Sequence, residues 1–256
     1  MRYKLTLKLV DPLRNRLPVN YQFELGSWFF RMLNNPDTAL YSYLVANRYV
    51  SNEEPFKAFV FSHLMVPDRS IEDDRLVIGS DRIGLIFSTI PDESLVNLVK
   101  ENFQDAGFLL GDRTSQVSFE VEKVEQVPEP EFTNKMTFKT LSPLHIGVRI
   151  PGKRNEVYLS PESSGYAYFF YENLYQKYRL LEGQDHPYDV LAGTFKLRST
   201  VTQKGIIMRA GRSGQVKLIG YQLRFRLQAD PALLRIGWYL GFGEKNHLGF
   251  GCCESL

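Results

Sequence analysis

Apolar residues occupy every second position from Arg2 to Leu9, and charged or polar residues fill most of the positions between them. This period of two predicts a half-buried strand. The spacing then changes to three and four residues, with Leu25 and Phe29 on one face, and predicts a helix opened by Leu17-Pro18. An Asn-Asn-Pro sequence ends that helix, and a second short helix is predicted over residues 37–46.

The rest of the first half contains more strands. They are predicted over residues 59–65, 75–78 and 83–89, and the glycine-containing turn between the last two is typical of a β-hairpin. A helix then starts at a Pro-Asp-Glu sequence, and a long alternating strand over residues 117–124 closes this half.

The second half repeats this order of elements. The predicted elements are a strand over residues 136–141, a helix over 170–181, strands over 195–201 and 217–227, a helix starting at Asp230-Pro231 and a strand within 250–254. Each half thus reads strand–helix–strand–strand–helix–strand, the order of the ferredoxin-like fold. We predict an α+β protein with two tandem ferredoxin-like domains, 1–127 and 134–256, joined by a Pro/Glu-rich linker.

Composition narrows the class of protein. With 43% hydrophobic and 23% charged residues among 256, the chain has the balance of a globular protein, which excludes wholesale disorder. No apolar run approaches the roughly 20 residues of a membrane span, and the first residues do not resemble a secretory signal. The two cysteines, Cys252 and Cys253, are adjacent, so a disulfide between them is awkward and no metal-ligand spacing exists. We expect a cytoplasmic protein without a metal or cofactor.

The net charge of +2 conceals an asymmetry between the two halves. Residues 134–256 contain 17 basic and 9 acidic side chains, a net charge of +8, whereas residues 1–133 contain 14 basic and 20 acidic side chains, a net charge of −6. A basic half next to an acidic half indicates that the basic half binds a polyanion.

The basic side chains concentrate in one tract. Residues 190–229 contain no acid and eight cations: Lys196, Arg198, Lys204, Arg209, Arg212, Lys217, Arg224 and Arg226. Residues two apart on a strand share a face, so the first two and the last two each form a cationic pair suited to a phosphate backbone. The alternative is a solvated strand face whose cations protect a sheet edge from aggregation. The length of the acid-free tract favours nucleic acid.

A glycine-rich segment, residues 241–251, follows the last helix. The residues predicted to contact a ligand are Gly241, Gly243, Lys245, Asn246, His247, Gly249 and Gly251. Glycines let backbone amides approach an anion, and the lysine adds charge. The segment is neither a Walker A loop nor a dinucleotide fingerprint, because here the glycines follow a helix and precede a strand, so a nucleotide cofactor is disfavoured. The alternative is a tight connection packed on the sheet.

The Gly-aromatic-Gly-x5-Gly-Phe-Gly pattern at the end of a tandem ferredoxin-like chain resembles the repeat-associated mysterious protein superfamily. The early Leu17-Pro18-Val19-Asn20-Tyr21 sequence, the Leu141-Ser142-Pro143 strand end and the chain length narrow this to a resemblance to the sixth CRISPR-associated protein family, whose members are endoribonucleases that trim precursor CRISPR RNA. The resemblance implies binding of a repeat RNA and cleavage without a metal.

The resemblance also points to a catalytic set that this chain lacks in part. Relatives place a tyrosine, a histidine and a lysine at positions that here hold Phe30, Val45 and Lys57. Because phenylalanine and valine cannot transfer protons, Lys57 is the only candidate left from this set. It would stabilise the charged phosphorane, or it is simply an exposed lysine next to a strand. The four histidines, His63, His145, His186 and His247, are weaker catalytic candidates, and only the last is expected to contact RNA.

Three hypotheses follow. The first is a CRISPR repeat-RNA endoribonuclease, and the second is a repeat-RNA-binding or scaffold subunit that does not cut. The partners expected are repeat RNA, other CRISPR effector subunits or a second copy of the chain, and no membrane. A small-molecule phosphate-binding enzyme would explain the glycine-rich segment but not the eight cations.

Overall fold

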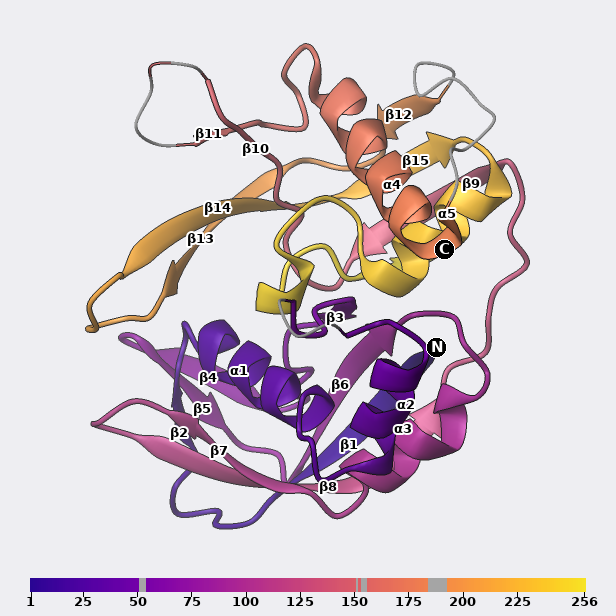
Figure 1. The fold of residues 1–256 in the computed structure, drawn as a ribbon. Helices are drawn as coiled ribbons and strands as arrows, with labels where there is room; N and C mark the ends of the chain where they lie inside the picture. The colour runs from indigo at the N-terminus through magenta and orange to yellow at the C-terminus, as the bar shows by residue number, and fades with distance from the viewer. Residues whose placement is uncertain (51–53, 151, 153–155, 184–192) are drawn as a thin grey trace. The chain divides into compact units, whose positions relative to one another are not determined.

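The computed structural model describes residues 1–50, 54–150, 152, 156–183 and 193–256. Contacts divide the chain into two compact units (Figure 1). Unit 1 comprises Met1–Ala58 and His63–Pro128, and unit 2 comprises Phe59–Ser62 and Glu129–Leu256. The short strand β3 (Phe59–Phe61) therefore belongs, by its contacts, to the second unit although it interrupts the sequence of the first.

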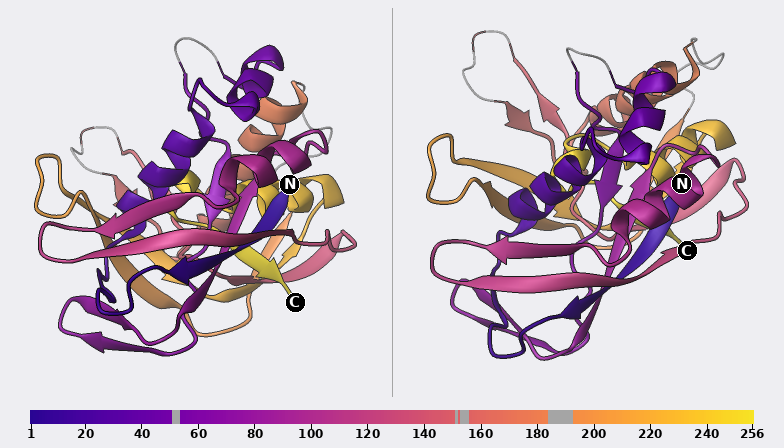
Figure 2. Two further views of the ribbon diagram at one scale, coloured as in Figure 1. Left: turned by 90° about the horizontal axis from the view of Figure 1, so that it is seen from below. Right: turned by 60° about the horizontal axis from the view of Figure 1, so that its bottom comes forward.

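Unit 1 combines an antiparallel sheet with helices and a small accessory sheet. Its elements are β1 (Arg2–Leu9), β2 (Arg16–Pro18), α1 (Gln22–Leu33), α2 (Ala39–Ala46), β4 (Arg69–Glu72), β5 (Arg75–Ile78), β6 (Arg82–Thr89), α3 (Leu95–Phe103), β7 (Gly107–Gly111) and β8 (Gln116–Gln126). The strands β6, β1, β8 and β7 lie side by side in that order. The helices α1 and α3 cover one side of this sheet (Figure 2).

The strand predicted from Arg2 to Leu9 is confirmed as β1, because its alternating apolar residues are buried against the helices. The core of unit 1 is aromatic: Phe29 of α1 stacks on Phe87 of β6 with ring centroids 4.7 Å apart, and Phe103 of α3 lies 5.2 Å from Phe87. Burying such rings supplies the dominant stabilising term for a unit of this size.

The hairpin predicted between the strands at residues 75–78 and 83–89 is wrong. β5 instead pairs with β4 and β2, and β6 pairs with β1. The turn lies earlier, between Glu72 and Arg75, where Asp73 has a φ of 54°. Aspartate tolerates this left-handed conformation better than most residues, so the Asp73-Asp74 pair forms the turn without a glycine.

Leu17-Pro18 does not open a helix, which is a second correction. Both residues lie in β2, paired with β5, and α1 begins only at Gln22. Proline is acceptable at either place, since an edge strand tolerates its missing N–H as well as a first helical turn does. The sequence also gave no indication of β4 or of β7, and only the first three residues of the strand predicted at 59–65 are a strand, β3.

Unit 2 contains the second ferredoxin-like arrangement. Besides β3, its elements are β9 (Lys135–Thr140), β10 (Gly147–Val148), β11 (Val157–Tyr158), α4 (Tyr166–Glu182), β12 (Thr194–Leu197), β13 (Thr202–Met208), β14 (Val216–Gln222), β15 (Arg224–Gln228), α5 (Pro231–Leu240), the 3-10 helix η2 (Asn246–Leu248) and β16 (Cys253–Ser255). Its main sheet has the order β12-β15-β9-β16. This places the first strand of the unit between the third and the fourth, as the ferredoxin-like connection requires, and the predicted α+β fold class is confirmed.

The two long strands predicted in the second half are four strands. β12 and β15 join the main sheet, whereas β13 and β14 form a separate hairpin that extends away from α4 and α5 (Figure 1). The break in the second strand falls at Leu223, whose amide donates to the hydroxyl of Thr140 at 3.1 Å instead of continuing the hairpin ladder. Continuous β-propensity along the sequence does not reveal such a change of sheet.

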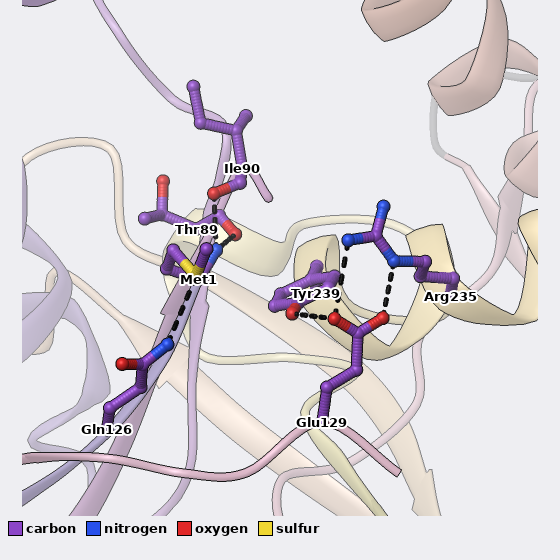
Figure 3. A network of polar contacts seen from close by, with 7 residues as sticks. All are labelled: Met1, Thr89, Ile90, Gln126, Glu129, Arg235 and Tyr239. Atoms are coloured by element: carbon purple, nitrogen blue, oxygen red, sulfur yellow. Dashed lines mark hydrogen bonds and ion pairs between the residues drawn. The ribbon is translucent and has the colours of Figure 1, made fainter. Parts of the chain in front are cut away.

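Polar contacts fix two chain segments inside their own units (Figure 3). In unit 1, the backbone nitrogen of Met1 donates to the carbonyl oxygen of Thr89 at 2.8 Å. In unit 2, the carboxylate of Glu129 accepts hydrogen bonds from Arg235 and, at 2.8 Å, from the Tyr239 hydroxyl. Burial raises the pKa of Glu129, but the hydrogen bonds from Arg235 and Tyr239 outweigh it, so this pKa is lowered and the carboxylate stays charged. The predicted Pro/Glu-rich linker is thus anchored to α5.

Candidate nucleic-acid interface

The main sheet of unit 2 has one apolar and one cationic face. On the apolar face, Phe170 of α4 packs 5.8 Å from Phe225 of β15 and 5.1 Å from Phe195 of β12. Because side chains alternate along a strand, Arg224 and Arg226, which flank Phe225, lie on the opposite face. The packing of the helices on one face therefore directs the cations to the other.

Strand pairing brings four of the predicted cations together. Lys196 of β12 is directly opposite Arg226 of β15, and the amide of Arg198 donates to the carbonyl of Arg224 at 2.8 Å. Lys196, Arg198 and Arg224 are exposed, and Arg226 is half-buried. We call these four residues, together with Lys139, the cationic sheet face.

Lys139 belongs to this face but was missed by the sequence analysis. It lies in β9 directly opposite Arg224, and its ammonium group is 2.9 Å from the carboxylate of Glu254 in β16. In the sequence, Lys139 is simply a lysine in a predicted strand, and nothing near it in the chain indicates a cationic face. Its membership of the face depends on which strand pairs with which, and that information is tertiary.

Both arginines of β15 thus face another cation across the sheet. Like charges directly opposite each other destabilise a sheet by a few tenths of a kcal/mol or more. In the part of the chain that the structure describes, no carboxylate forms an ion pair with Lys196, Arg198, Arg224 or Arg226. This arrangement works against folding and suits an external polyanion, which would supply the missing negative charge.

The remaining cations of the tract lie on the β13–β14 hairpin and do not form one face. Lys204 pairs with Gly220 and Lys217 pairs with Ile207, which puts the two lysines on opposite faces of the hairpin. The stem of Lys217 crosses the strand at Gly205, where a Cβ atom would lie 2.4 Å from the Lys217 Cε atom. Arg209 and Arg212 lie in the turn at the tip.

The tract begins at residue 190, and residues 190–192 lie outside the described part of the chain, as does His186. All eight cations are described.

The glycines of the glycine-rich segment, residues 241–251, are required by close packing. Gly243 has a φ of 68°, and a Cβ atom there would lie 2.5 Å from the carbonyl oxygen of His145. Gly251 has a φ of 80°, and a Cβ atom would lie 2.0 Å from the carbonyl oxygen of Phe242. Gly241 and Gly249 are also buried with positive φ. Gly243 and Gly251 therefore approach the protein's own backbone, and at Gly241 a Cβ atom would lie 2.5 Å from the side-chain nitrogen of Asn246.

Several backbone amides of the segment are also committed within unit 2. The amides of Phe242, Glu244 and Gly251 donate to Gly251, His145 and Pro143 respectively, at 2.8–2.9 Å. The side-chain amide of Asn246 is buried and donates to the carbonyl of Phe250 at 3.0 Å. Asn246 was predicted to contact RNA, but the structure places it inside the segment, where it holds the turn together. Of the residues predicted to contact RNA in this segment, only Lys245 and His247 are partly exposed.

Lys245 and His247 lie among groups from other elements of unit 2. The Lys245 ammonium is 3.6 Å from the carboxylate of Glu156, a weak and partly exposed ion pair. The His247 ring lies edge-on to Phe59 of β3, with centroids 6.4 Å apart.

Lys177 is the second residue that the sequence analysis missed. It lies on α4, and its ammonium group donates to the carbonyl oxygens of Gly241 and Gly243, both at 2.6 Å. Burial lowers its pKa to about 7, against the opposing charge of Glu244. The sequence did contain an indication of this position, because Lys177 lies three residues after Leu174 and therefore on the buried face of α4.

Lys57 is exposed and lies in an extended segment just before β3. Its position is set by Asn34 at the end of α1, whose side-chain amide donates to the carbonyl of Phe56 at 3.0 Å and whose side-chain oxygen accepts the Phe56 amide at 2.8 Å. Phe30 lies on α1 and the exposed Val45 lies on α2. The structure therefore holds the backbone next to Lys57 firmly and offers no proton-transfer group at those two positions.

The histidines and tyrosines add little chemistry. His145 is fully buried, its Nδ1 atom lies 2.6 Å from the Ile219 carbonyl, and burial lowers its pKa, so the ring is neutral and out of reach of a substrate. His63 is half-buried. The Tyr43 hydroxyl donates to Asp92 at 2.8 Å, which gives this residue a structural role.

The described residues contain neither a metal site nor a membrane span. No group of three or more His, Cys, Asp or Glu side chains there could hold a metal ion. No helix in the described ranges is long and apolar enough to cross a membrane.

Comparison with known families agrees with this architecture. Residues 127–255 match the family model described as CRISPR associated protein Cas6, C-terminal, and residues 16–125 match that described as CRISPR-associated protein Cas6, N-terminal. The chain belongs to the Cas6 family, and the resemblance inferred from its sequence is confirmed.

Individual relatives are distant in sequence but similar over most of their length. The CRISPR-associated endoribonuclease Cas6 1 of Methanocaldococcus jannaschii is 25% identical over 94% of this chain and 87% of its own length. A putative CRISPR-associated endoribonuclease-like protein Cas6 of Pyrococcus furiosus is 24% identical over 99% of this chain and 98% of its own. A solved structure described as an RAMP protein binding different RNA substrates shares the fold, with a TM-score of 0.80 and 22% identity over 100% of this chain and 99% of that one.

Proposed function

We propose that this protein binds CRISPR repeat RNA through the cationic sheet face, the β13–β14 hairpin and the partly exposed side chains Lys245 and His247. The observation that carries the proposal is the pairing of cation with cation across β12, β15 and β9, which has no benefit for folding. A similar fold occurs in a protein whose description names RNA substrates. An RNA backbone supplies regularly spaced negative charges that would relieve this repulsion.

We further propose that the protein cleaves precursor CRISPR RNA by attack of a ribose 2′-hydroxyl on the adjacent phosphorus. The P–O5′ bond breaks, leaving a 2′,3′-cyclic phosphate and a 5′-hydroxyl. The exposed Lys57 ammonium would stabilise the charge that develops on the phosphorane. Because Phe30 and Val45 cannot transfer protons, water takes the 2′ proton and protonates the 5′ oxygen. The internal nucleophile makes appreciable rates attainable by positioning alone.

The second candidate is a repeat-RNA-binding subunit that does not cut. It is favoured by Phe30 and Val45, and one relative is itself described only as endoribonuclease-like. Assembly with other CRISPR subunits, formation of a homodimer and action in the cytoplasm stay predictions.

One experiment separates the two candidates. The protein is incubated with its cognate repeat RNA in EDTA, and the products are resolved and tested for a cyclic phosphate end. A discrete product supports the enzyme, and tight binding without a product supports the binding subunit. If the product forms, Lys57→Ala is expected to slow cleavage at least tenfold, and Lys57→Arg, which keeps the charge, to slow it less. Cleavage at the wild-type rate by Lys57→Ala would remove Lys57 from the mechanism.

A further inference from the structure

A hollow of about 400 Å³ lies beside the cationic sheet face. Its lining includes Arg226 of β15, Lys135 and Thr137 of β9, and Glu131 and Thr133 of the segment before β9. Thr137 is directly opposite Arg226, and its hydroxyl accepts a hydrogen bond from the Nε atom of that arginine at 3.2 Å. The hollow is therefore continuous with the surface that we propose for RNA, since the two share Arg226.

The two cations of the hollow are suited to a phosphate. The bond to Thr137 uses only the Nε–H group of Arg226, so the terminal nitrogens of the guanidinium are left for a phosphate, which it can bind bidentately. Lys135 is exposed, and no carboxylate of the described chain forms an ion pair with either cation. Both charges are thus available to an anionic ligand.

One acidic side chain, Glu131, also lines the hollow, and a carboxylate is unexpected on a surface for a polyanion. It is exposed and forms neither an ion pair nor a hydrogen bond with the described residues. Because a carboxylate repels phosphate, it weakens such a surface unless the ligand donates N–H groups to it. Phosphates have no N–H group, whereas the bases of RNA do. Glu131 therefore indicates that a base enters the hollow.

The chain on both sides of Glu131 is held in place. Two residues earlier, the carboxylate of Glu129 accepts the hydroxyl of Tyr239 in α5 at 2.8 Å. In the next position, the ring of Phe132 lies edge-on to Trp238, also in α5, with centroids 6.0 Å apart. Because these contacts order the backbone before any ligand binds, the carboxylate loses less conformational entropy on binding. The segment is prearranged to present Glu131.

We propose that this hollow binds one unpaired guanine nucleotide of the RNA, with its phosphate on Arg226 and Lys135 and its base on the carboxylate of Glu131. The inference rests on the proposed RNA binding. The apolar side chains of Met136 and Leu256, which also line the hollow, give the base a non-polar contact.

The donor pattern of the base determines the choice of guanine. Guanine has two adjacent donors, N1–H and N2–H, which match the two oxygens of a carboxylate. Adenine and cytosine have an acceptor nitrogen next to their amino group, and uracil has a carbonyl oxygen on each side of its N–H group. Each of these three bases therefore sets an acceptor against the carboxylate of Glu131.

The test measures the affinity of the full-length protein for uridine octamers that contain one central guanosine, inosine or uridine. Inosine differs from guanosine only in lacking the N2 amino group. We expect the guanosine octamer to bind about tenfold more tightly than the uridine octamer, and the inosine octamer about threefold more tightly. Equal affinities for guanosine and inosine octamers, or no octamer binding by protein that binds its cognate repeat RNA, would overturn the proposal.

Two variants separate the contact to the base from the contact to the phosphate. Glu131→Gln is expected to bind the guanosine and uridine octamers within about twofold of each other, whereas Lys135→Ala should weaken all octamers alike, because they share the phosphate. Glu162→Gln removes an exposed carboxylate of unit 2 outside the hollow, so this matched control should keep the tenfold preference. A tenfold preference that persists in Glu131→Gln would refute only this inference. Wild-type protein that binds neither the octamers nor its cognate repeat RNA would refute the proposed function as well.

Discussion

The cations of unit 1 and those of the cationic sheet face have opposite surroundings. In unit 1, Arg75 is 2.7 Å from Asp112, and Arg82 is 2.7 Å from Glu122. In unit 2, Arg226 lies opposite Lys196, and Arg224 lies opposite Lys139. The same side-chain types are neutralised in place in one unit and left facing each other in the other.

This difference explains why net charge alone was a poor guide. An arginine that already has a carboxylate partner must give it up to bind a phosphate, and the exchange yields little free energy. An arginine facing another cation gains on binding, because the phosphate also relieves a repulsion. We therefore expect RNA to bind at the cations that lack a carboxylate partner.

The largest effect is expected from Arg224→Ala combined with Arg226→Ala. Loss of two charged contacts of about 1.4 kcal/mol each lowers RNA affinity about 100-fold at low salt. The slope of the logarithm of affinity against the logarithm of salt concentration becomes shallower by about two. The free energy of unfolding should stay the same or rise. Binding titrations at several salt concentrations check the first two points. The matched control is Lys4→Ala with Lys8→Ala, which removes two strand cations opposite Glu125 and Glu120. An equal loss of affinity in the control would show that cations facing a carboxylate bind RNA as well as cations facing another cation.

The next effect separates binding from folding at one position. Arg226→Glu creates an opposite-charge pair with Lys196, so we expect the free energy of unfolding to rise by about 0.5 kcal/mol while RNA affinity falls at least tenfold. Denaturant unfolding and binding are measured on the same preparation. Arg226→Gln, which removes the charge without adding a pair, should lose less affinity. If Arg226→Glu is less stable than Arg226→Gln, the idea of a folding cost from cation pairing is wrong.

A smaller effect is expected at Lys139, since Glu254 already neutralises part of its charge. Lys139→Ala should lower RNA affinity about threefold or less. Glu254→Gln should raise it by up to about twofold, because it frees the lysine. The two variants therefore move affinity in opposite directions. A fall in affinity for Glu254→Gln would show that the pair acts as a unit.

The smallest effect on RNA is expected in unit 1. Arg75→Ala should leave affinity within about twofold and cost at most about 1 kcal/mol of stability at neutral pH. Burial raises the pKa of Asp112, but hydrogen bonds from Ser115, Arg75 and Thr114 outweigh it and lower the pKa below its ordinary value. A lowered carboxyl pKa gives stability that is present above the unfolded value near 4 and is lost as the pH falls through the folded value. The Tm measured by thermal unfolding should therefore fall less between pH 7 and pH 3 in Arg75→Ala than in the wild type. An equal loss would exclude Arg75 as a cause of the lowered pKa.

Much of the fold could be predicted because local pattern and tertiary structure agree. The alternation in β1 and the Asp230-Pro231 start of α5, where the Asp230 carboxylate accepts the Ala232 amide at 2.8 Å, depend on neighbours in the chain. The pairing of β5 with β4 and β2, in place of the hairpin predicted over residues 75–89, could not be predicted, since a turn sequence does not say which strand lies next to which. The accessory sheet and the break at Leu223 depend on which strand pairs with which, and this pairing is decided only when the chain folds.

The candidate site divides in the same way. The sequence by itself determined the class of protein, the positions of the eight cations and the glycine-rich segment, because composition and spacing are properties of the chain. The tertiary structure decided that four of those cations meet Lys139 on one face, that two lie on opposite faces of a hairpin, and that Lys177 reaches Gly241 and Gly243. These contacts join residues far apart in sequence. Their energies come from strand register, burial and cross-strand charge, which exist only once the chain has folded.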